Sequence, residues 1–562
     1  MHHASPRTVF PLRLIAAVLT VCPLLLFTEV VHAQHPTIMP TAHVPEAVTS
    51  GQAPMVGHVA GERRLSLAIS LPPRNQSDLE DFLARLYDPQ GPDFHKYLSV
   101  KEFTERFGPS EADFAAVSEF ARSHGLTVVG EPANHMVLDV EGPAAAVESA
   151  LHISLNVYRH PTENRTFYAP DREPTLDLDV ALLHISGLDD FSPPRPKYLE
   201  APATDPLAKS VAKAVAKVTT GGSGPNYSYL GSDLRSAYYG SGVLNGAGQS
   251  LGIFSLAGYN LSDVQLYFNN VNQPLNVPII GVSVNGASLS CLPPSCNDTE
   301  QSLDIEQAIS MAPGLKQVQF YVGKTAVSVL NRMASDNTSK SLSCSWGWGY
   351  NESAIDPILQ EMAAQGQTFF VATGDQGSNT PANVVWPADD PWVTAVGGTV
   401  LLTNFPAETW KSETGWTNSA GMPSPNNVPI PSYQQLAGVV TAANGASSAL
   451  RNIPDIASQS SPRQYNCSIG TCKNFGGGTS YAAPLWAGLI AMANQRSLAN
   501  GGSYVGFLNP ALYAIGTGSG FTKDIHDITS GSNGAYSAVS GYDLVTGWGS
   551  PKGVNLINAL VP

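Results

Sequence analysis

Short apolar segments with the length of buried strands recur through the second half of the chain. Four of them are clear, at residues 250–256, 317–322, 368–372 and 393–396, and helical patterns and glycine-rich turns separate them. Strands that are apolar on both faces and alternate with helices are typical of a mostly parallel sheet covered by helices on both sides. We therefore expect an α/β fold of this kind over residues 227–562.

The first half alternates strand-like and helix-like segments at closer intervals. The patterns predict strands at 65–71 and 136–140, and helices at 77–87 and 110–124. They indicate a small α+β domain, of ferredoxin-like type, over residues 34–193.

Composition changes between the two domains, at residues 194–226. This stretch is rich in Ala, Lys, Thr, Pro and Gly, which indicates an exposed connector whose basic residues offer cleavage points.

The first 33 residues have the layout of an export signal. Arg7 and Arg13 precede an apolar run from 14 to 27, and Val31-His-Ala33 places small residues at the cleavage positions. The run is short for a permanent membrane anchor, which is the alternative. We expect residues 1–33 to be removed and the protein to be secreted, without membrane attachment.

Charge excludes one class of partner. The 562 residues include 45 Asp and Glu against 30 Lys and Arg, a formal net charge of −15. Nucleic acid requires a basic face, so we expect no nucleic-acid partner.

Five cysteines follow the signal. Cys291/Cys296 and Cys467/Cys472 are two close pairs, each able to close a small disulfide loop in an exported protein. Neither pair has the neighbouring His or Cys of a zinc site. We expect Cys344 to be a buried small apolar residue rather than a nucleophile.

Histidine is almost absent from the second half of the chain. Nine histidines lie between His35 and His184, and only His526 follows. Imidazole catalysis in the larger domain would depend on His526 alone, and the chain has no His-Glu-x-x-His motif. If this domain is a hydrolase, we expect its base to be a carboxylate.

Three segments supply polar candidates. Glu300 and Asp304 lie four residues apart in a helical pattern that ends at Pro-Gly, so they share one helix face and can share a proton. Asp375 follows a buried strand, where parallel sheets bind ligands. Ser480 follows three glycines and precedes an apolar helix, whose N–H groups suit an oxyanion. The alternatives are structural: acidic residues at a helix start, a turn Asp and a Ser N-cap.

Together these segments resemble the sedolisin family, the serine-carboxyl peptidases related to subtilisin. That family's nucleophile motif is Ser-Gly-Thr-Ser-x-x-x-Pro, and this chain has Gly477-Gly-Thr-Ser-Tyr-Ala-Ala-Pro484, with Gly in place of the first Ser. Glu300 and Asp304 match the family's Glu-x-x-x-Asp helix. Gly374-Asp-Gln-Gly377 matches its Gly-Asp-x-Gly motif, with Gln376 where Ser is more usual.

The resemblance extends along nearly the whole chain. Residues 343–347 are similar to the family's substrate-lining Ser-x-Ser-Trp-Gly strand, and 394–399 to another core signature. Residues 86–110 are similar to its activation prodomain, which would inhibit the enzyme within the same chain. Residues 527–551 are similar to its calcium-binding region.

The resemblance implies a role for each candidate residue. Ser480 would be the nucleophile, Glu300 the general base and Asp304 the group that orients Glu300. Asp375 would have to be protonated to donate to the oxyanion. Carboxyl groups have pKa values near 4 and burial raises them only by some units, so an acidic working pH follows. The substrates would be proteins or peptides, and we expect a monomer.

The resemblance also implies one structural Ca²⁺ ion. Asp527 and Asp543 would supply carboxylate oxygens, and the carbonyls of Ile528, Val539 and Gly541 would complete the shell. The family commonly has Gly at the position of Val539. The alternative is that the two Asp residues cap turns.

Two rival interpretations remain. A subtilisin-like hydrolase would use His526 as its base and work best near neutral pH. A catalytically inactive binding protein stabilised by calcium would not process itself. Within the peptidase interpretation, internal cleavage and removal of N-terminal tripeptides both remain open. We also hypothesise that the nine upstream histidines charge in acid and weaken the inhibitory contact; solvated surface histidines are the alternative.

Overall fold

The computed structural model describes residues 37–38, 43–200, 221–350, 352–378 and 385–561. The export signal expected at residues 1–33 lies outside this range. The described residues all belong to one compact unit. No helix within the described ranges combines the length and the apolarity needed to cross a bilayer.

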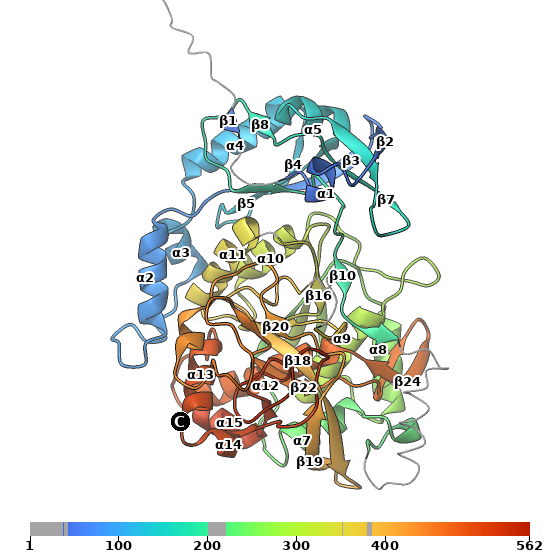
Figure 1. Cartoon of the computed structure of the whole chain (residues 1–562), viewed down its shortest axis with the longest axis vertical. Coiled ribbons are helices and arrows are strands. Elements are labelled where there is room, and N and C mark those ends of the chain that lie inside the picture. The colour runs from blue at the N-terminus through green and yellow to red at the C-terminus, as the bar shows by residue number, and fades with distance from the viewer. Residues whose placement is uncertain (1–36, 39–42, 201–220, 351, 379–384, 562) are drawn as a thin grey trace, which may run out of the picture. The chain divides into compact units, whose positions relative to one another are not determined.

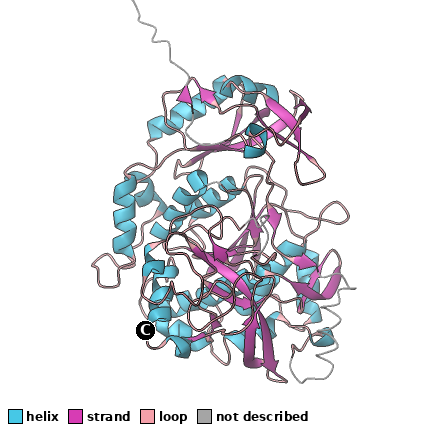
Figure 2. Ribbon diagram, in the orientation of Figure 1, coloured by secondary structure: helices cyan, strands magenta, loops and turns pink. Residues whose placement is uncertain are grey.

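An eight-stranded sheet forms the centre of the second half (Figures 1 and 2). Its order is β13-β14-β12-β15-β17-β18-β19, with β22 also paired to β18. Every pair is parallel except β18–β19. The mostly parallel sheet predicted from the sequence is therefore confirmed. The strands are β12 (Ser250–Ser255), β13 (Ile279–Ser283), β14 (Gln317–Val322), β15 (Ser341–Cys344), β17 (Thr368–Ala372), β18 (Thr394–Asn404), β19 (Thr409–Gly415) and β22 (Ile456–Gln459).

Strand β18 runs further than the sequence pattern indicated. Gly397 and Gly398 suggest a turn in the sequence but lie inside the strand. A side chain at Gly398 would meet Ser460 and the Trp416 ring within 3 Å, so glycine is needed there for packing and not for a turn.

Helices cover both faces of the sheet. On β15 the Ser341 hydroxyl donates to the Ala487 carbonyl of α12 at 2.6 Å. The alternate residue Leu342 lies toward the opposite face, close to Gly252 and to Met333 of α10. Helices α9 and α12 pack against each other, as do α10 and α11. These four helices are α9 (Thr299–Met311), α10 (Ala326–Asp336), α11 (Glu352–Ala364) and α12 (Ala482–Ala499).

Shorter elements surround this core. They are α7 (Gly231–Tyr238), α8 (Leu261–Asn270), α13 (Asn509–Thr517), α14 (Phe521–Asp524), α15 (Gly553–Leu560), β20 (Met422–Pro423), β21 (Asn452–Ile453), β23 (Gln464–Ser468), β24 (Thr471–Gly477), β25 (Ile525–His526) and β26 (Ser550–Pro551).

The first half contains a four-stranded antiparallel sheet of order β4-β5-β3-β9. With α4 and α5 it forms the βαββαβ arrangement of ferredoxin-like folds, as predicted. A second antiparallel sheet, β2-β6-β7, was not predicted from the sequence. The elements are β2 (Met55–His58), β3 (Arg64–Ser70), α2 (Gln76–Leu86), α3 (Val100–Arg106), α4 (Glu111–Ser123), β4 (Thr127–Gly130), β5 (Val137–Pro143), α5 (Ala144–Leu151), β6 (Leu155–Arg159), β7 (Thr166–Pro170) and β9 (His184–Ser186).

Both expected disulfides are present. Cys291 is bonded to Cys296, and Cys467 is bonded to Cys472 across the β23–β24 hairpin. Cys344 is free and buried, and burial raises the pKa of its thiol. It is therefore the inert apolar residue that was predicted.

Helix α9 is buried along its whole length and lies against α12 at a glycine. A Cβ atom at Gly488 would lie 2.8 Å from Met311 Cβ and 3.1 Å from the Ala308 carbonyl. Side chains larger than glycine would separate the two helices.

We expect Gly488→Val to destabilise the protein by about 1–3 kcal/mol, because the added methyl groups overpack this contact. Urea-induced unfolding measures the change in the free energy of unfolding. The control is Gly520→Val, since a Cβ there meets nothing closer than 3.5 Å. Equal stability of the two variants would contradict the close approach.

Candidate active site

Helix α9 places two carboxyl groups side by side and out of water. Glu300 and Asp304 lie one turn apart and are each 1% exposed. Burial raises the pKa of both groups well above the usual range, and the neighbouring Asp304 raises that of Glu300 further. The Ser345 hydroxyl donates to Asp304 Oδ1 at 2.6 Å. Asp304 Oδ2 has no partner among the described residues, so it is the oxygen that can carry a proton.

Ser480 lies in a single 3₁₀ turn, Thr479–Tyr481, directly before α12. The sequence predicted a helix N-terminus, and the structure inserts this short turn before it. Ser345 Oγ is 3.3 Å from the Ser480 carbonyl oxygen, so Ser345 contacts both the nucleophile segment and the carboxyl pair. The nearby Ser480 hydroxyl lowers the pKa of Glu300. Within the described structure, however, neither Ser480 Oγ nor either carboxylate oxygen of Glu300 has a partner with hydrogen-bond geometry.

Asp375 is oriented by the same turn. The Thr479 N–H and hydroxyl donate to Asp375 Oδ1 at 2.8 and 3.0 Å, and the Gly374 N–H donates to Thr479 Oγ1 at 3.0 Å. Burial raises the pKa of Asp375 to about 7, against the effect of the Thr479 hydrogen bonds. Oδ2 has no partner among the described residues. Because Oδ1 already accepts two donors, a proton belongs on Oδ2.

The start of the connector crosses this site as an extended strand. Segment β10 (Arg195–Pro196) pairs antiparallel with β16 (Trp346–Gly347), and β11 (Leu199–Glu200) pairs antiparallel with β24. Between them, the Lys197 N–H donates to the Ser345 carbonyl at 2.8 Å. The exposed connector predicted from the sequence is therefore wrong at Lys197, which is buried.

The peptide bond after Lys197 lies beside the catalytic candidates. A Cβ atom at Gly478 would be 2.6 Å from Asp375 Oδ2, 3.0 Å from the Lys197 carbonyl oxygen and 2.9 Å from Tyr198 Cα. Gly478 has φ of 136°, so glycine is required there both for its backbone conformation and for this close approach. The Lys197–Tyr198 bond thus lies next to Gly478 and the Asp375 carboxyl group.

Sequence reasoning found the four polar candidates but missed three of their partners. It noted Ser345 as part of a substrate-lining strand but not its bond to Asp304. Thr479 was treated only as part of the glycine-rich motif. Nothing in the sequence distinguished Lys197 from the other basic residues of the connector.

The remaining histidine of the larger domain is structural. The His526 ring stacks on Trp410 at 3.8 Å, with the ring planes 8° apart. Burial lowers the pKa of His526 to about 3. An imidazole held neutral against a tryptophan gives no support to the His526 mechanism.

The expected calcium region brings its two carboxylates to one loop. Asp527 accepts hydrogen bonds from the Gly541 N–H and the Ser540 hydroxyl, and Asp543 accepts one from the Val539 N–H. Burial raises the pKa of Asp543 to about 7 and also raises that of Asp527. Asp543 Oδ1 also accepts hydrogen bonds from the N–H groups of Val545 and Thr546, the arrangement of a turn-capping carboxylate. No described basic side chain acts on either group, so a bound cation would compensate both carboxylates.

Backbone carbonyl ligands are essential to a calcium site in this loop. Nowhere in the described ranges do three or more His, Cys, Asp or Glu side chains form a metal-binding group. An ion here would need the carbonyl oxygens of Ile528, Val539 and Gly541 as well as the two carboxylates.

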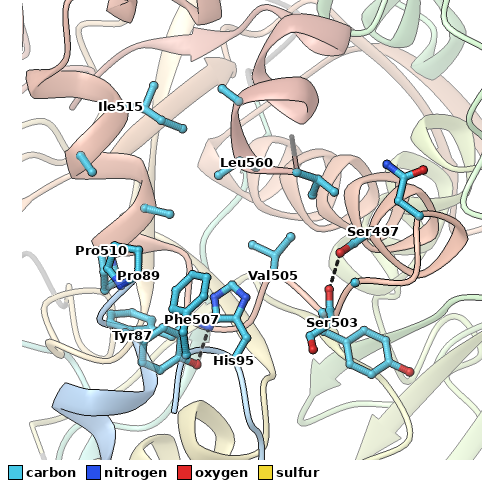
Figure 3. Close-up of a pocket in the computed structure, with 18 residues that line it drawn as sticks. Tyr87, Pro89, His95, Ser497, Ser503, Val505, Phe507, Pro510, Ile515 and Leu560 are labelled. Atoms are coloured by element: carbon cyan, nitrogen blue, oxygen red, sulfur yellow. Dashed lines mark hydrogen bonds between the residues drawn. The ribbon is translucent and has the colours of Figure 1, made fainter. Parts of the chain in front are cut away.

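A cavity of about 710 Å³ lies elsewhere (Figure 3). Tyr87 and His95 line it together with Val505, Phe507 and Leu560. None of Glu300, Asp304, Asp375 and Ser480 lines it. The catalytic candidates are covered instead by residues 195–200.

Comparison with known proteins identifies the family. The chain is 30% identical to kumamolisin from Bacillus sp. (strain MN-32), over 91% of this chain and 95% of that protein. It is 28% identical to sedolisin from Pseudomonas sp. (strain 101), over 89% and 87% of the two chains. The chain belongs to the sedolisin family.

Two further comparisons agree with membership in the sedolisin family. Residues 52–191 match the family described as Pro-kumamolisin, activation domain. The solved structure of Pseudomonas sedolisin, a serine-carboxyl proteinase complexed with two molecules of pseudo-iodotyrostatin, aligns with a TM-score of 0.51 and 27% identity. The alignment covers 59% of this chain and 97% of that chain. The protein is thus a serine-type peptidase with an activation domain, a peptidase zymogen that acts on proteins or peptides.

We expect Ser345→Ala to lower kcat/KM about 2- to 10-fold, the value of a hydrogen bond between neutral groups. The Ser345 hydrogen bond lowers the pKa of Asp304. Without it, the pKa of Asp304 rises, so Asp304 holds its proton to a higher pH. Peptide hydrolysis measured against pH tests this.

The matched control is Ser343→Ala, on the same strand. The Ser343 hydroxyl is buried and has no partner among the described residues, so its removal costs little. An unchanged kcat/KM and pH profile in Ser345→Ala would contradict the positioning role of Ser345.

Proposed function

We propose that this sedolisin-family protein is a secreted acid endopeptidase that processes its own precursor. In this proposal Ser480, Glu300 and Asp304 form the catalytic triad, and Asp375 donates to the oxyanion. The supporting observation is the position of the Lys197–Tyr198 bond among these groups. The proposed organisation is a signal at 1–33, an activation prodomain at 34–193, a connector at 194–226 and the peptidase domain at 227–562.

The proposed reaction begins with transfer of the Ser480 hydroxyl proton to the Glu300 carboxylate. Ser480 Oγ then attacks the substrate carbonyl carbon. The protonated Asp375 Oδ2 and the Ser480 N–H donate to the oxyanion. Glu300 returns the proton to the leaving amine, and water releases the acyl group by the same route in reverse. Asp304 keeps the second proton of the pair, so Glu300 alone is ionised.

Asp375 sets the upper pH limit in this scheme. Its folded pKa, about 7 with the connector in place, is raised by burial. The protonated donor is present below this value and is lost as the pH rises through it, because a carboxylate would repel the oxyanion. Water that enters after the connector leaves would lower the pKa of Asp375, which places the working range in acid.

The path of the connector favours internal cleavage over removal of tripeptides. Arg195 pairs with Gly347 two residues before Lys197, and the chain continues upstream into the prodomain. A tripeptidyl-peptidase must close this end of its cleft. Here the cleft admits a chain with many residues before the bond, which supports an endopeptidase.

The prodomain contact contains groups with opposite pH dependence. Burial lowers the pKa of His95 to about 4, below the free imidazole value of about 6.5. The packing of neutral His95 against Tyr97 is therefore fully favourable above about pH 6.5 and weakens as the pH falls from there towards about 4. Burial raises the pKa of Asp139 to about 6 and that of Glu361 to about 8, which strengthens their contacts in acid. The hypothesis of histidine-driven release therefore depends on His95 outweighing these carboxyl groups.

Calcium is the proposed structural ion at Asp527 and Asp543, completed by the carbonyls of Ile528, Val539 and Gly541. When bound, it would neutralise two buried carboxylates and tie the 539–543 loop to residues 527–528. The protein brings both carboxylates to that loop through their hydrogen bonds with the N–H groups of Val539 and Gly541.

We expect the purified precursor to cut itself below pH 6, and Ser480→Ala to abolish cutting at every pH. Incubation between pH 3 and pH 8 with mass spectrometry of the products measures both. The wild-type rate should fall as the pH rises through about 7, the value to which burial raises the pKa of Asp375. Self-cleavage by Ser480→Ala, or a rate that peaks in alkali, would reject the proposed mechanism.

We expect calcium to stabilise the protein by about 2.7 kcal/mol at a concentration 100 times its dissociation constant. Thermal unfolding of Ser480→Ala with calcium or with a chelator measures this without self-digestion. Asp543→Asn serves as the comparison, since the amide keeps the shape but loses the charge. A midpoint that does not respond to calcium at pH 7 would contradict the site.

A further inference from the structure

The Lys197 side chain enters a closed pocket beside the catalytic candidates. Its ammonium donates to the Ala372 carbonyl at 2.9 Å and to the Val385 carbonyl at 3.1 Å. Ala372 is the last residue of β17, the strand that leads to Asp375. The whole of Lys197 is only 7% exposed. A buried ammonium is costly unless donors and charge are matched around it, so this pocket is built for a cation.

Asp389 is a buried carboxyl group that acts electrostatically on Lys197. Burial raises the pKa of Asp389 and Lys197 lowers it, so a lysine in the pocket favours the ionised carboxylate. Its Oδ2 accepts hydrogen bonds from the Ser424 hydroxyl at 2.6 Å and the Asn426 amide at 3.0 Å. Its Oδ1 is buried and has no hydrogen-bond partner among the described residues. Lys197 and Asp389 act on each other electrostatically, and Asp389 belongs to the same loop as Val385. Glu300 also acts on Lys197 electrostatically, but unlike Glu300, Asp389 has no role in the proposed reaction.

The backbone fixes which residue of a substrate enters the pocket. The Lys197 N–H donates to the Ser345 carbonyl, and its own carbonyl lies beside Gly478 and Asp375 Oδ2. The residue whose side chain fills the pocket is therefore the one whose carbonyl is attacked. Specificity at the cleaved bond follows from this single pocket.

We propose that this pocket selects lysine, so that the enzyme cleaves on the carboxyl side of lysine residues, and that Asp389 determines this selectivity. The Lys197–Tyr198 bond is then the first bond cut in the precursor. The inference rests on the proposed function and specifies its substrate class. Two carbonyl acceptors match a compact ammonium, whereas a guanidinium presents five donors in a wider, planar fork. Lysine is therefore preferred over arginine as well as over apolar residues.

The first test uses mature enzyme and peptides that differ only at the residue before the cleaved bond: lysine, arginine or norleucine. We expect kcat/KM for lysine to exceed that for norleucine at least 10-fold. Asp389→Asn should lose at least 10-fold on lysine and keep its rate on norleucine, which also shows that the variant is folded. The control Asp336→Asn, on α10 and paired with Arg332, should behave as wild type.

The second test uses the full precursor. We expect the earliest fragment to begin at Tyr198, and Lys197→Met to slow the first cut at least 10-fold or to move it. Lys213→Met, elsewhere in the connector, should not change the first cut. Mass spectrometry at early times identifies the new N-terminus.

The outcomes separate the two levels of inference. Equal rates on lysine and norleucine, or a first cut elsewhere that still requires Ser480, would overturn the lysine pocket and leave the proposed function standing. Preference for lysine that persists in Asp389→Asn would overturn the role of Asp389. A precursor and enzyme without Ser480-dependent hydrolysis would overturn the proposed function and this inference with it.

Discussion

Exclusion of water from three carboxyl groups around one serine is the constraint on which the site depends. Glu300, Asp304 and Asp375 are buried, and none of them forms an ion pair within the described structure. The contrast is Asp455, a fully buried carboxylate that binds Arg451 through two hydrogen bonds, at 2.9 and 2.6 Å. A carboxylate that stays charged in the core is given a guanidinium. Burial without such a partner raises the pKa of a carboxyl group and favours its protonated form, and a protonated carboxyl can donate.

The connector places a cation beside these groups. Lys197 is buried beside them, and Asp389, Asp375 and Glu300 all favour its charged form. Burial nevertheless lowers the pKa of its ammonium to about 8, so the lysine is charged throughout the acid range. The same residue thus stabilises the zymogen electrostatically and presents a bond for cleavage. Loss of the connector removes a positive charge from the site and admits water.

The sequence was sufficient where the signal is local. The spacing of Glu300 and Asp304, the glycines before Ser480 and the strand before Asp375 are each patterns within a few residues. The structure has the two acids on one helix and Asp375 after its strand as expected, while Ser480 lies in a 3₁₀ turn just before α12. The sheet was predictable for the same reason, because buried strands have a characteristic length and composition.

Long-range pairing explains what the sequence did not show. Lys197 is buried only because β10 and β11 pair with strands more than 100 residues away, and nothing within the connector encodes that partner. Asp389 similarly follows the Trp386-Pro387 dipeptide and resembles a turn residue in the sequence. Its position on the pocket depends on Ser424 and Asn426, which are supplied by a later loop. A specificity pocket formed by three loops has no local pattern.

In the proposed scheme the connector lies in the position of a substrate, so its path alone would not prevent cleavage. The Lys197 carbonyl already lies beside Asp375, while Ser480 and Glu300 are both buried but not aligned as a hydrogen-bonded pair. In this scheme, delay would come from the protonation states of the carboxyl groups and not from a misplaced bond. After the cut, the prodomain would still hold through Tyr97, whose hydroxyl donates to the Tyr504 and Val505 carbonyls. Activation then consists of two separable steps, cleavage of the connector and release of the prodomain, and each has its own titrating groups.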